Sequence, residues 1–185
     1  MKSFLLFSIC FLLGNQGLKS QELPSSYHTL HYGLEVDFLS FSFKGYSFSA
    51  YLGMQQCRVR LNRSMAKIPE RISINGVQQE RINTTQVAFD FFINKDLKGF
   101  YTGPALSIWQ TRFKKYPYKE FDYQSIVFSY TAGYNFFLTK KLYLAPYIAL
   151  HVRVIGNQDF ELFKIQYKPY TFLPEINFKL GWKFN

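Results

Sequence analysis

Apolar and polar residues alternate along most of the chain, and the alternation is clearest at its C-terminal end. There Ile176, Phe178, Leu180, Trp182 and Phe184 alternate with polar or small residues. A period of two places these five side chains on the same face of a β-strand. The pattern therefore predicts a strand with one apolar and one polar face.

Seven further segments share this pattern, so that the predicted strands lie at 29–39, 46–54, 57–62, 85–93, 100–111, 124–138, 142–154 and 174–185. The predicted turns at 55–56, 94–99 and 139–141 are short, and the predicted loops at 63–84, 112–123 and 155–170 are long. The connection at 40–45 is short where a long one is expected. Alternating short turns and long loops are typical of outer-membrane barrels. The sequence predicts an all-β fold, an eight-stranded antiparallel up-and-down transmembrane β-barrel.

Three prolines lie inside predicted strands, namely Pro104, Pro146 and Pro174. A proline removes a hydrogen bond from the strand ladder, and a closed barrel has no free edge to accommodate it. We therefore expect each of them near a β-bulge or near a strand end.

The first 20 residues have the pattern of a signal peptide, and 21–185 then form the barrel domain. Lys2 precedes an apolar run at 4–13, which is too short to cross a bilayer as a helix. A retained anchor is the alternative. Cys57 is the only cysteine after residue 20, so the sequence predicts no disulfide and no cysteine-rich metal site.

Composition agrees with an exported membrane barrel. The chain has 21 Phe, 14 Tyr and a net charge of +10. An exported basic protein without a basic helix or an RNA-binding aromatic motif is not expected to bind nucleic acid. Phosphates of surface lipid, including lipopolysaccharide, are the better partner, and simple solubility is the alternative reason for the charge.

With its signal peptide, its strand count, its loop alternation and its C-terminal aromatic residues, the chain resembles the small eight-stranded outer-membrane β-barrels of Gram-negative bacteria, the OmpA/OmpW/OmpX-like group. The resemblance implies a place in the bacterial cell outer membrane, and we expect a monomer. It also implies that barrel-insertion machinery reads the C-terminal signal, here Phe178, Leu180, Trp182 and Phe184, although Phe184 is penultimate. The group has no shared catalytic motif and includes structural barrels, adhesion and resistance factors, small channels and lipid-modifying enzymes.

If the apolar faces meet lipid, the opposite faces fill the lumen. The predicted polar lumen network contains His31, Glu35, Asp37, Arg58, Arg60, Asp90, His151, Arg153, Glu175, Lys179 and Lys183. An eight-stranded lumen is just wide enough for side chains, and buried charges must be paired. We expect Glu35 and Asp37 to reach Lys179 or Lys183 and the lumen to be plugged. A narrow channel for ions or small solutes is the alternative.

Catalysis is not expected, because no recognisable motif is present. His31 or His151 with Glu35 or Asp37 has the composition of a general base, and Ser107 or Ser129 has the hydroxyl for a lipid A acyl hydrolase or acyltransferase. Two histidines without a third close ligand do not predict a metal site, and no cofactor is expected.

The predicted loop at 112–123 is rich in basic and aromatic residues, which suit lipid headgroups, glycan or a partner protein. The candidate binding residues are Arg112, Lys114, Lys115, Tyr116, Tyr118 and Lys119. The alternative is an aromatic girdle with solvated lysines. A soluble periplasmic barrel of lipocalin type is a further rival, which would reverse every face and place the apolar side chains in the lumen.

Overall fold

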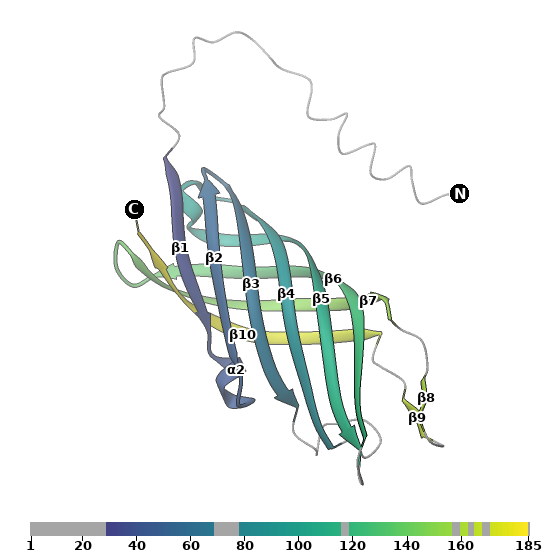
Figure 1. Cartoon of the computed structure of the whole chain (residues 1–185). Coiled ribbons are helices and arrows are strands. Elements are labelled where there is room, and N and C mark those ends of the chain that lie inside the picture. Colours follow the sequence, from purple (N-terminus) through teal and green to yellow (C-terminus); the bar gives the residue numbers. More distant parts are fainter. Residues whose placement is uncertain are drawn as a thin grey trace, which may run out of the picture.

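The computed structural model describes residues 29–68, 78–115, 119–156, 160–162, 165–167 and 171–184. Eight strands form a closed barrel in the order β1-β10-β7-β6-β5-β4-β3-β2, and each pairs with its neighbours in antiparallel fashion. Their bounds are β1 Leu30–Asp37, β2 Tyr46–Met54, β3 Cys57–Ile68, β4 Gln78–Phe92, β5 Gly99–Lys115, β6 Lys119–Phe137, β7 Leu142–Ile155 and β10 Phe172–Lys183 (Figure 1). The predicted all-β up-and-down barrel is confirmed. The predicted signal peptide lies outside the described residues.

The two ends of the barrel differ in their connections. At one end, here called the turn end, β1 begins, β10 ends, and short turns join β2 to β3, β4 to β5 and β6 to β7. The 3-10 helix η2 (Lys95–Leu97) forms the second of these turns. At the opposite end, here called the loop end, the connection at 40–45 contains the short helix α2 (Leu39–Ser42) (Figure 1). A separate two-stranded sheet, β8 (Phe160–Leu162) with β9 (Ile165–Tyr167), interrupts the predicted loop at 155–170.

Four strands continue well beyond their predicted ends. β3 and β4 occupy much of the predicted loop at 63–84, and β5 and β6 pair as far as Lys115 with Lys119, so most of the predicted loop at 112–123 is a hairpin. These two loop predictions are wrong. These extensions lack a strict alternation of apolar and polar residues, as in Arg63-Ser64-Met65-Ala66, so the sequence pattern did not predict them. Cross-strand pairs such as Arg112 with Asp122 stabilise the β5–β6 hairpin.

The prolines interrupt the ladder without producing bulges in two of three cases. Pro104 and Pro146 lie where pairing lapses between β4 and β5 and between β6 and β7, and the register on both sides of each gap is unchanged. The expectation of a bulge or strand end is wrong for both, because a local opening of one ladder accommodates the missing N–H. Pro174 does lie near the beginning of β10.

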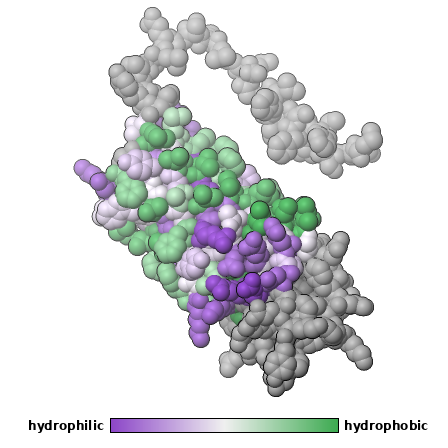
Figure 2. Space-filling view, viewed as in Figure 1, coloured by the Kyte–Doolittle hydropathy of each residue, from purple (hydrophilic) through white to green (hydrophobic). Residues whose placement is uncertain are grey.

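The barrel has an apolar outer surface and a charged interior. Large apolar side chains on the outer faces are exposed, for example Leu61 at 56% and Ile176 at 79%, whereas Arg58 and Glu35 in the lumen are each 1% exposed. Figure 2 shows hydrophobic residues over much of the visible outer surface of the barrel, with hydrophilic residues gathered towards the loop end. The face predictions are therefore correct, and a barrel with an apolar lumen of lipocalin type is excluded. Among the described residues no helix is long and apolar enough to cross a membrane.

Glycines make room for the tyrosines of the lumen. Gly181 pairs with Tyr143, and a Cβ atom at Gly181 would lie 2.0 Å from the Tyr143 ring. Gly133 pairs with Tyr101 in the same way, at 2.6 Å. Because a glycine has no side chain, the ring on the neighbouring strand occupies the space above it, and large side chains fit into a narrow lumen. Together with Tyr51, Phe92 and Leu97 these rings pack in the turn half of the lumen. The buried hydrophobic cluster to which they belong consists of Tyr51, Phe92, Leu97, Tyr101, Tyr143, Ala145, Tyr147 and Ala149.

Candidate functional site

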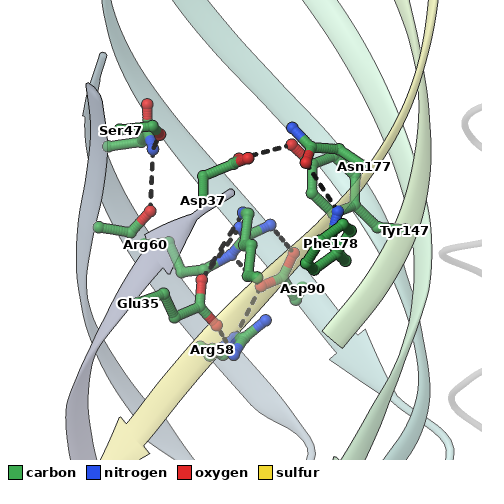
Figure 3. Close-up of polar contacts among 12 residues, drawn as sticks. Glu35, Asp37, Ser47, Arg58, Arg60, Asp90, Tyr147, Asn177 and Phe178 are labelled. Atoms are coloured by element: carbon green, nitrogen blue, oxygen red, sulfur yellow. Dashed lines mark hydrogen bonds and ion pairs between the residues drawn. The ribbon is translucent and has the colours of Figure 1, made fainter. Parts of the chain in front are cut away.

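The middle of the lumen holds a cluster of ion pairs, here called the central cluster. It contains Glu35 of β1, Arg58 and Arg60 of β3, Asp90 of β4 and Lys179 of β10. The period of two directs all five side chains inwards, and the register places Arg58 opposite Asp90. The strands thus bring charges from distant parts of the sequence to one level of the barrel (Figure 3).

The two carboxylates of the central cluster bind the two guanidinium groups. Asp90 Oδ2 accepts hydrogen bonds from Arg58 Nε at 2.8 Å and Arg60 Nε at 2.6 Å, and Asp90 Oδ1 accepts one from Arg60 Nη2 at 2.8 Å. Glu35 Oε1 accepts hydrogen bonds from Arg58 Nη1 and Tyr143 Oη, both at 2.7 Å. Lys179 Nζ lies 3.6 Å from Glu35 Oε2. Charges buried this deeply are tolerated because their partners replace the lost water.

Aromatic rings surround the Arg58 guanidinium. Its Cζ atom lies 5.1 Å from the centroid of Tyr51, 5.0 Å from Phe92 and 5.1 Å from Tyr101. Such contacts stabilise a cation that is screened from water. The rings and the ion pairs together leave the central cluster almost without exposed surface.

A second group of polar residues, here called the loop-end chain, lies nearer the loop end. It contains Ser129, His151, Glu175, Tyr147 and Asp37. Ser129 Oγ and His151 Nδ1 are 2.7 Å apart, and His151 Nε2 and Glu175 Oε2 are also 2.7 Å apart. Tyr147 Oη lies 2.6 Å from Glu175 Oε1 and 2.8 Å from Asp37 Oδ2. The chain links strands β6, β7, β10 and β1 across the lumen.

The serine, histidine and glutamate of this chain have the composition of a hydrolase triad. The carboxylate that contacts His151 is Glu175, and not Glu35 or Asp37, which the sequence offered as the acid of a possible general base. Ser129 is completely buried, and its hydroxyl contacts Nδ1 whereas the serine of the usual triad contacts Nε2. A nucleophile needs access to its substrate, so this geometry favours a structural hydrogen-bonded chain.

A cavity of about 100 Å³ adjoins both groups in the loop half of the lumen. Asp37, Arg60, His151, Glu175 and Lys179 contribute charged or titratable groups to its wall. Serine, threonine and asparagine side chains form much of the remaining wall, among them Ser47, Asn62, Ser64, Thr84 and Thr131. The cavity has the size and polarity for a few water molecules or a small polar group.

The remaining predicted lumen residues are buried but lie apart from both groups. His31 Nε2 lies 3.7 Å from Asp96 Oδ1 at the turn end, and Lys183 Nζ lies 5.4 Å from the centroid of Phe137. Arg153 lies at the loop end near Trp109 and Tyr123. The eleven residues therefore do not form a single network. Ser107, the other serine considered, donates its hydroxyl to the carbonyl of Val127.

Sequence reasoning missed the two tyrosines that join the polar groups. Tyr143 extends the central cluster, and Tyr147 connects Asp37 with Glu175. Both have the lumen-facing parity of strand β7, so the alternation placed them inside the barrel, but it did not assign them to the predicted polar network. It could not have shown which carboxylates they reach.

The predicted loop-binding residues lie mainly in the β5–β6 hairpin. Arg112, Lys114 and Lys115 belong to β5 and Lys119 begins β6, whereas Tyr116 and Tyr118 lie outside the described residues. Arg112 Nε donates to Asp122 Oδ1 at 2.7 Å, and Arg112 Nη2 donates to Asp122 Oδ2 at 3.0 Å. These hydrogen bonds lower the pKa of Asp122 below its ordinary value.

The C-terminal aromatic residues lie on the outer face at the seam between β10 and β1. Phe178 stacks on Phe38 with their centroids 5.1 Å apart, and Phe184 lies 5.5 Å from Tyr32. Trp182 is exposed at 47%. Their predicted role as an insertion signal stays a prediction. Within the described ranges no group of three or more His, Cys, Asp or Glu residues is arranged to hold a metal ion.

Comparison with known proteins finds similar chains among solved structures. No family model and no curated protein matches the chain. Among solved structures, the N-terminal β-barrel domain of Pseudomonas aeruginosa OprF aligns with a TM-score of 0.44 and 9% sequence identity, over 84% of this chain and 96% of that chain.

Proposed function

We propose that this chain is an integral outer-membrane β-barrel protein with a plugged polar lumen and a structural or surface-interaction role. The observation that carries the proposal is the inverted distribution of side chains, with apolar residues outside and ion pairs inside. In water each Å² of exposed apolar surface costs about 25 cal/mol, and soluble monomers rarely expose large continuous apolar patches. Lipid around the barrel removes this cost.

The closed strand order supports the same environment. In the hydrocarbon core every backbone N–H and C=O needs a partner within the protein, and a closed barrel provides one for each strand. The long β5–β6 hairpin and helix α2 project from the loop end, the end that faces outwards in barrels of this kind. Outer-membrane lipid, including lipopolysaccharide, is the proposed partner of this end, and barrel-insertion machinery that of the C-terminal strand.

Fractionation of cells followed by gel electrophoresis of boiled and unboiled samples tests the proposal. We expect the protein in the outer-membrane fraction, with a faster band when unboiled, because a closed barrel resists detergent until it is heated. A protein in the soluble fraction without a mobility shift would contradict the proposal.

The packing of the lumen supports a plug and not a channel. The side chains of the central cluster and the tyrosine rings beside them are almost completely buried in the lumen, and ion pairs between β1, β3 and β4 fix their positions. Recordings from planar bilayers test this part separately. We expect no steady single-channel conductance, and regular conductance steps would favour the small-channel alternative.

A lipid-modifying enzyme is the second candidate function, and the Ser129–His151–Glu175 contacts are the observation in its favour. The buried hydroxyl of Ser129 weighs against it. Labelling of the refolded protein with a fluorophosphonate probe distinguishes the two. We expect no labelling, and a signal that disappears in Ser129→Ala would support the enzyme.

A further inference from the structure

One buried guanidinium in the described part of the barrel has no carboxylate partner. Arg58 and Arg60 are paired with Glu35 and Asp90, but Arg153, which is only 8% exposed, forms no ion pair with any residue that the structure describes. Its Nε and Nη1 atoms are buried and have no hydrogen-bond partner. Burying a cation without a partner is unfavourable, because the cation loses the water that solvated its charge. Such a group is therefore a candidate for binding an anion.

The surroundings of Arg153 contain further polar groups without partners. Its Cζ atom lies 5.8 Å from the ring centroid of Trp109 and 5.7 Å from that of Tyr123. The register places Ser125 opposite Trp109 and Thr111 opposite Tyr123. The hydroxyl oxygens of Ser125 and Thr111 are also buried without a hydrogen-bond partner. Three neighbouring strands thus direct unsatisfied polar groups to one region.

The chemistry of this region selects an anion with several acceptor oxygens. A guanidinium donates through a planar set of N–H groups that matches phosphate oxygens, and hydroxyl groups add further donors. A cation would be repelled by Arg153, and a neutral molecule would leave its charge unpaired. We propose that Arg153, flanked by Trp109 and Tyr123 and assisted by Ser125 and Thr111, binds a phosphate group at the loop end of the lumen.

Open space borders the proposed site on two sides. Thr111 and Tyr123 line a recess of about 390 Å³ whose other lining residues, Asn83, Gln110, Arg112, Asp122 and Gln124, have the outward-facing parity of their strands. Trp109 lines the cavity of about 100 Å³ described above. That cavity provides space in the lumen beside Trp109 for a phosphate group, whether it belongs to a lipid headgroup or to free phosphate.

The fluorescence of Trp109 gives a direct measurement. The chain has two tryptophans, and Trp182 lies on the outer face, so Trp182→Phe leaves Trp109 as the single reporter. This variant is refolded in maltoside micelles and titrated with inorganic phosphate, or with phosphatidylglycerol added to the micelles, and with sodium acetate at equal ionic strength. We expect a saturable change in emission with phosphate or with phosphatidylglycerol, and none with acetate.

Two matched variants assign the response to its residue. Arg153→Met retains much of the side-chain volume and removes the charge, and we expect at least a tenfold loss of phosphate-group affinity. It should also raise the unfolding temperature in phosphate-free buffer, which loss of a merely structural arginine would not do. Arg112→Met, at the exposed hairpin of the same end, should keep the response. Unboiled gel mobility checks that each variant is folded.

The outcomes separate the sources of the phosphate. A response to phosphatidylglycerol alone assigns the site to lipid headgroups, and a response to inorganic phosphate assigns it to free phosphate. A folded protein that responds to neither, an equal response to acetate, or a full response in Arg153→Met would overturn the proposal. Because folding is monitored by gel mobility, such a result leaves the proposed membrane barrel unaffected.

Discussion

The central cluster and the loop-end chain obey the same strand alternation but differ in their contact with water. In the central cluster the side chains of Glu35, Arg58 and Asp90 are 0–1% exposed. In the loop-end chain the Glu175 side chain is 29% exposed and lies beside a cavity. The first region is therefore shielded from water, and the second has room beside it for small molecules. Both regions contain carboxylates, so residue type does not account for this difference.

The difference has a steric cause. At the level of the central cluster, Tyr143 lies over Gly181 and Tyr101 over Gly133, so aromatic rings occupy the space between the ion pairs. Towards the loop end, small residues such as Ser47, Ser64 and Thr84 line the wall, and space remains.

Removing one carboxylate of the central cluster should have the largest effect. Asp90→Asn leaves Arg58 and Arg60 with Glu35 as their remaining close acid, and breaking a buried ion pair from one side costs about 3–5 kcal/mol. Urea unfolding of the refolded barrel, followed by gel mobility, measures the change in the free energy of unfolding. Asp96→Asn is the control, because the Asp96 side chain is 61% exposed at the turn end and should change stability little. Equal effects of the two variants would contradict the structural role of the cluster.

A matched pair of tyrosine variants compares the two regions directly. Tyr143→Phe removes the hydrogen bond to Glu35 and leaves that buried carboxylate less satisfied, which should cost about 1–3 kcal/mol. Tyr147→Phe should cost less, about 1 kcal/mol, because water at the partly exposed Glu175 replaces the hydroxyl. The same urea titration gives both values. A larger loss in Tyr147→Phe would reverse the proposed order of the two regions.

Removing the serine hydroxyl tests whether the loop-end chain is structural. Ser129→Ala deletes one hydrogen bond to His151 and should lower the free energy of unfolding by about 1 kcal/mol. The matched control is Ser107→Ala, which deletes a hydroxyl bonded to a backbone carbonyl at a similar depth. Comparable losses are expected, and an unchanged stability in Ser129→Ala alone would show that the chain is not held together by this contact.

The smallest effect concerns the exposed hairpin. Because Arg112 lowers the pKa of Asp122, the pair stabilises the hairpin at neutral pH, and this contribution is lost as the pH falls through the pKa of folded Asp122. In Arg112→Gln the pKa of Asp122 should rise towards its ordinary value. NMR titration of the Asp122 carboxyl carbon measures the shift in both proteins. An identical titration curve in the two would show that the pair does not form in solution.

The number of barrel strands, the up-and-down barrel and the strand face on which each side chain lies follow from the alternation of apolar and polar residues. The alternation from Tyr46 to Met54 coincides with β2, and the polar parity of Glu35, Arg58 and Asp90 placed them in the lumen. These features were predictable because a period of two is a local property of an extended chain with one apolar environment. Outside the apolar band the signal vanishes, so the sequence missed the extension of β3 to β6.

The contacts between particular polar groups depend on the tertiary structure. Register brings Ser129 opposite His151, and closure of the barrel brings Tyr143 to Glu35 across 108 positions of sequence. The same geometry pairs Arg58 and Arg60 with acids and leaves Arg153 without one. Pairing depends on the depth at which each strand sets its side chains in the shared lumen, and no local pattern encodes that depth. The distinction between a paired charge and one that requires a ligand therefore arises only when the barrel closes.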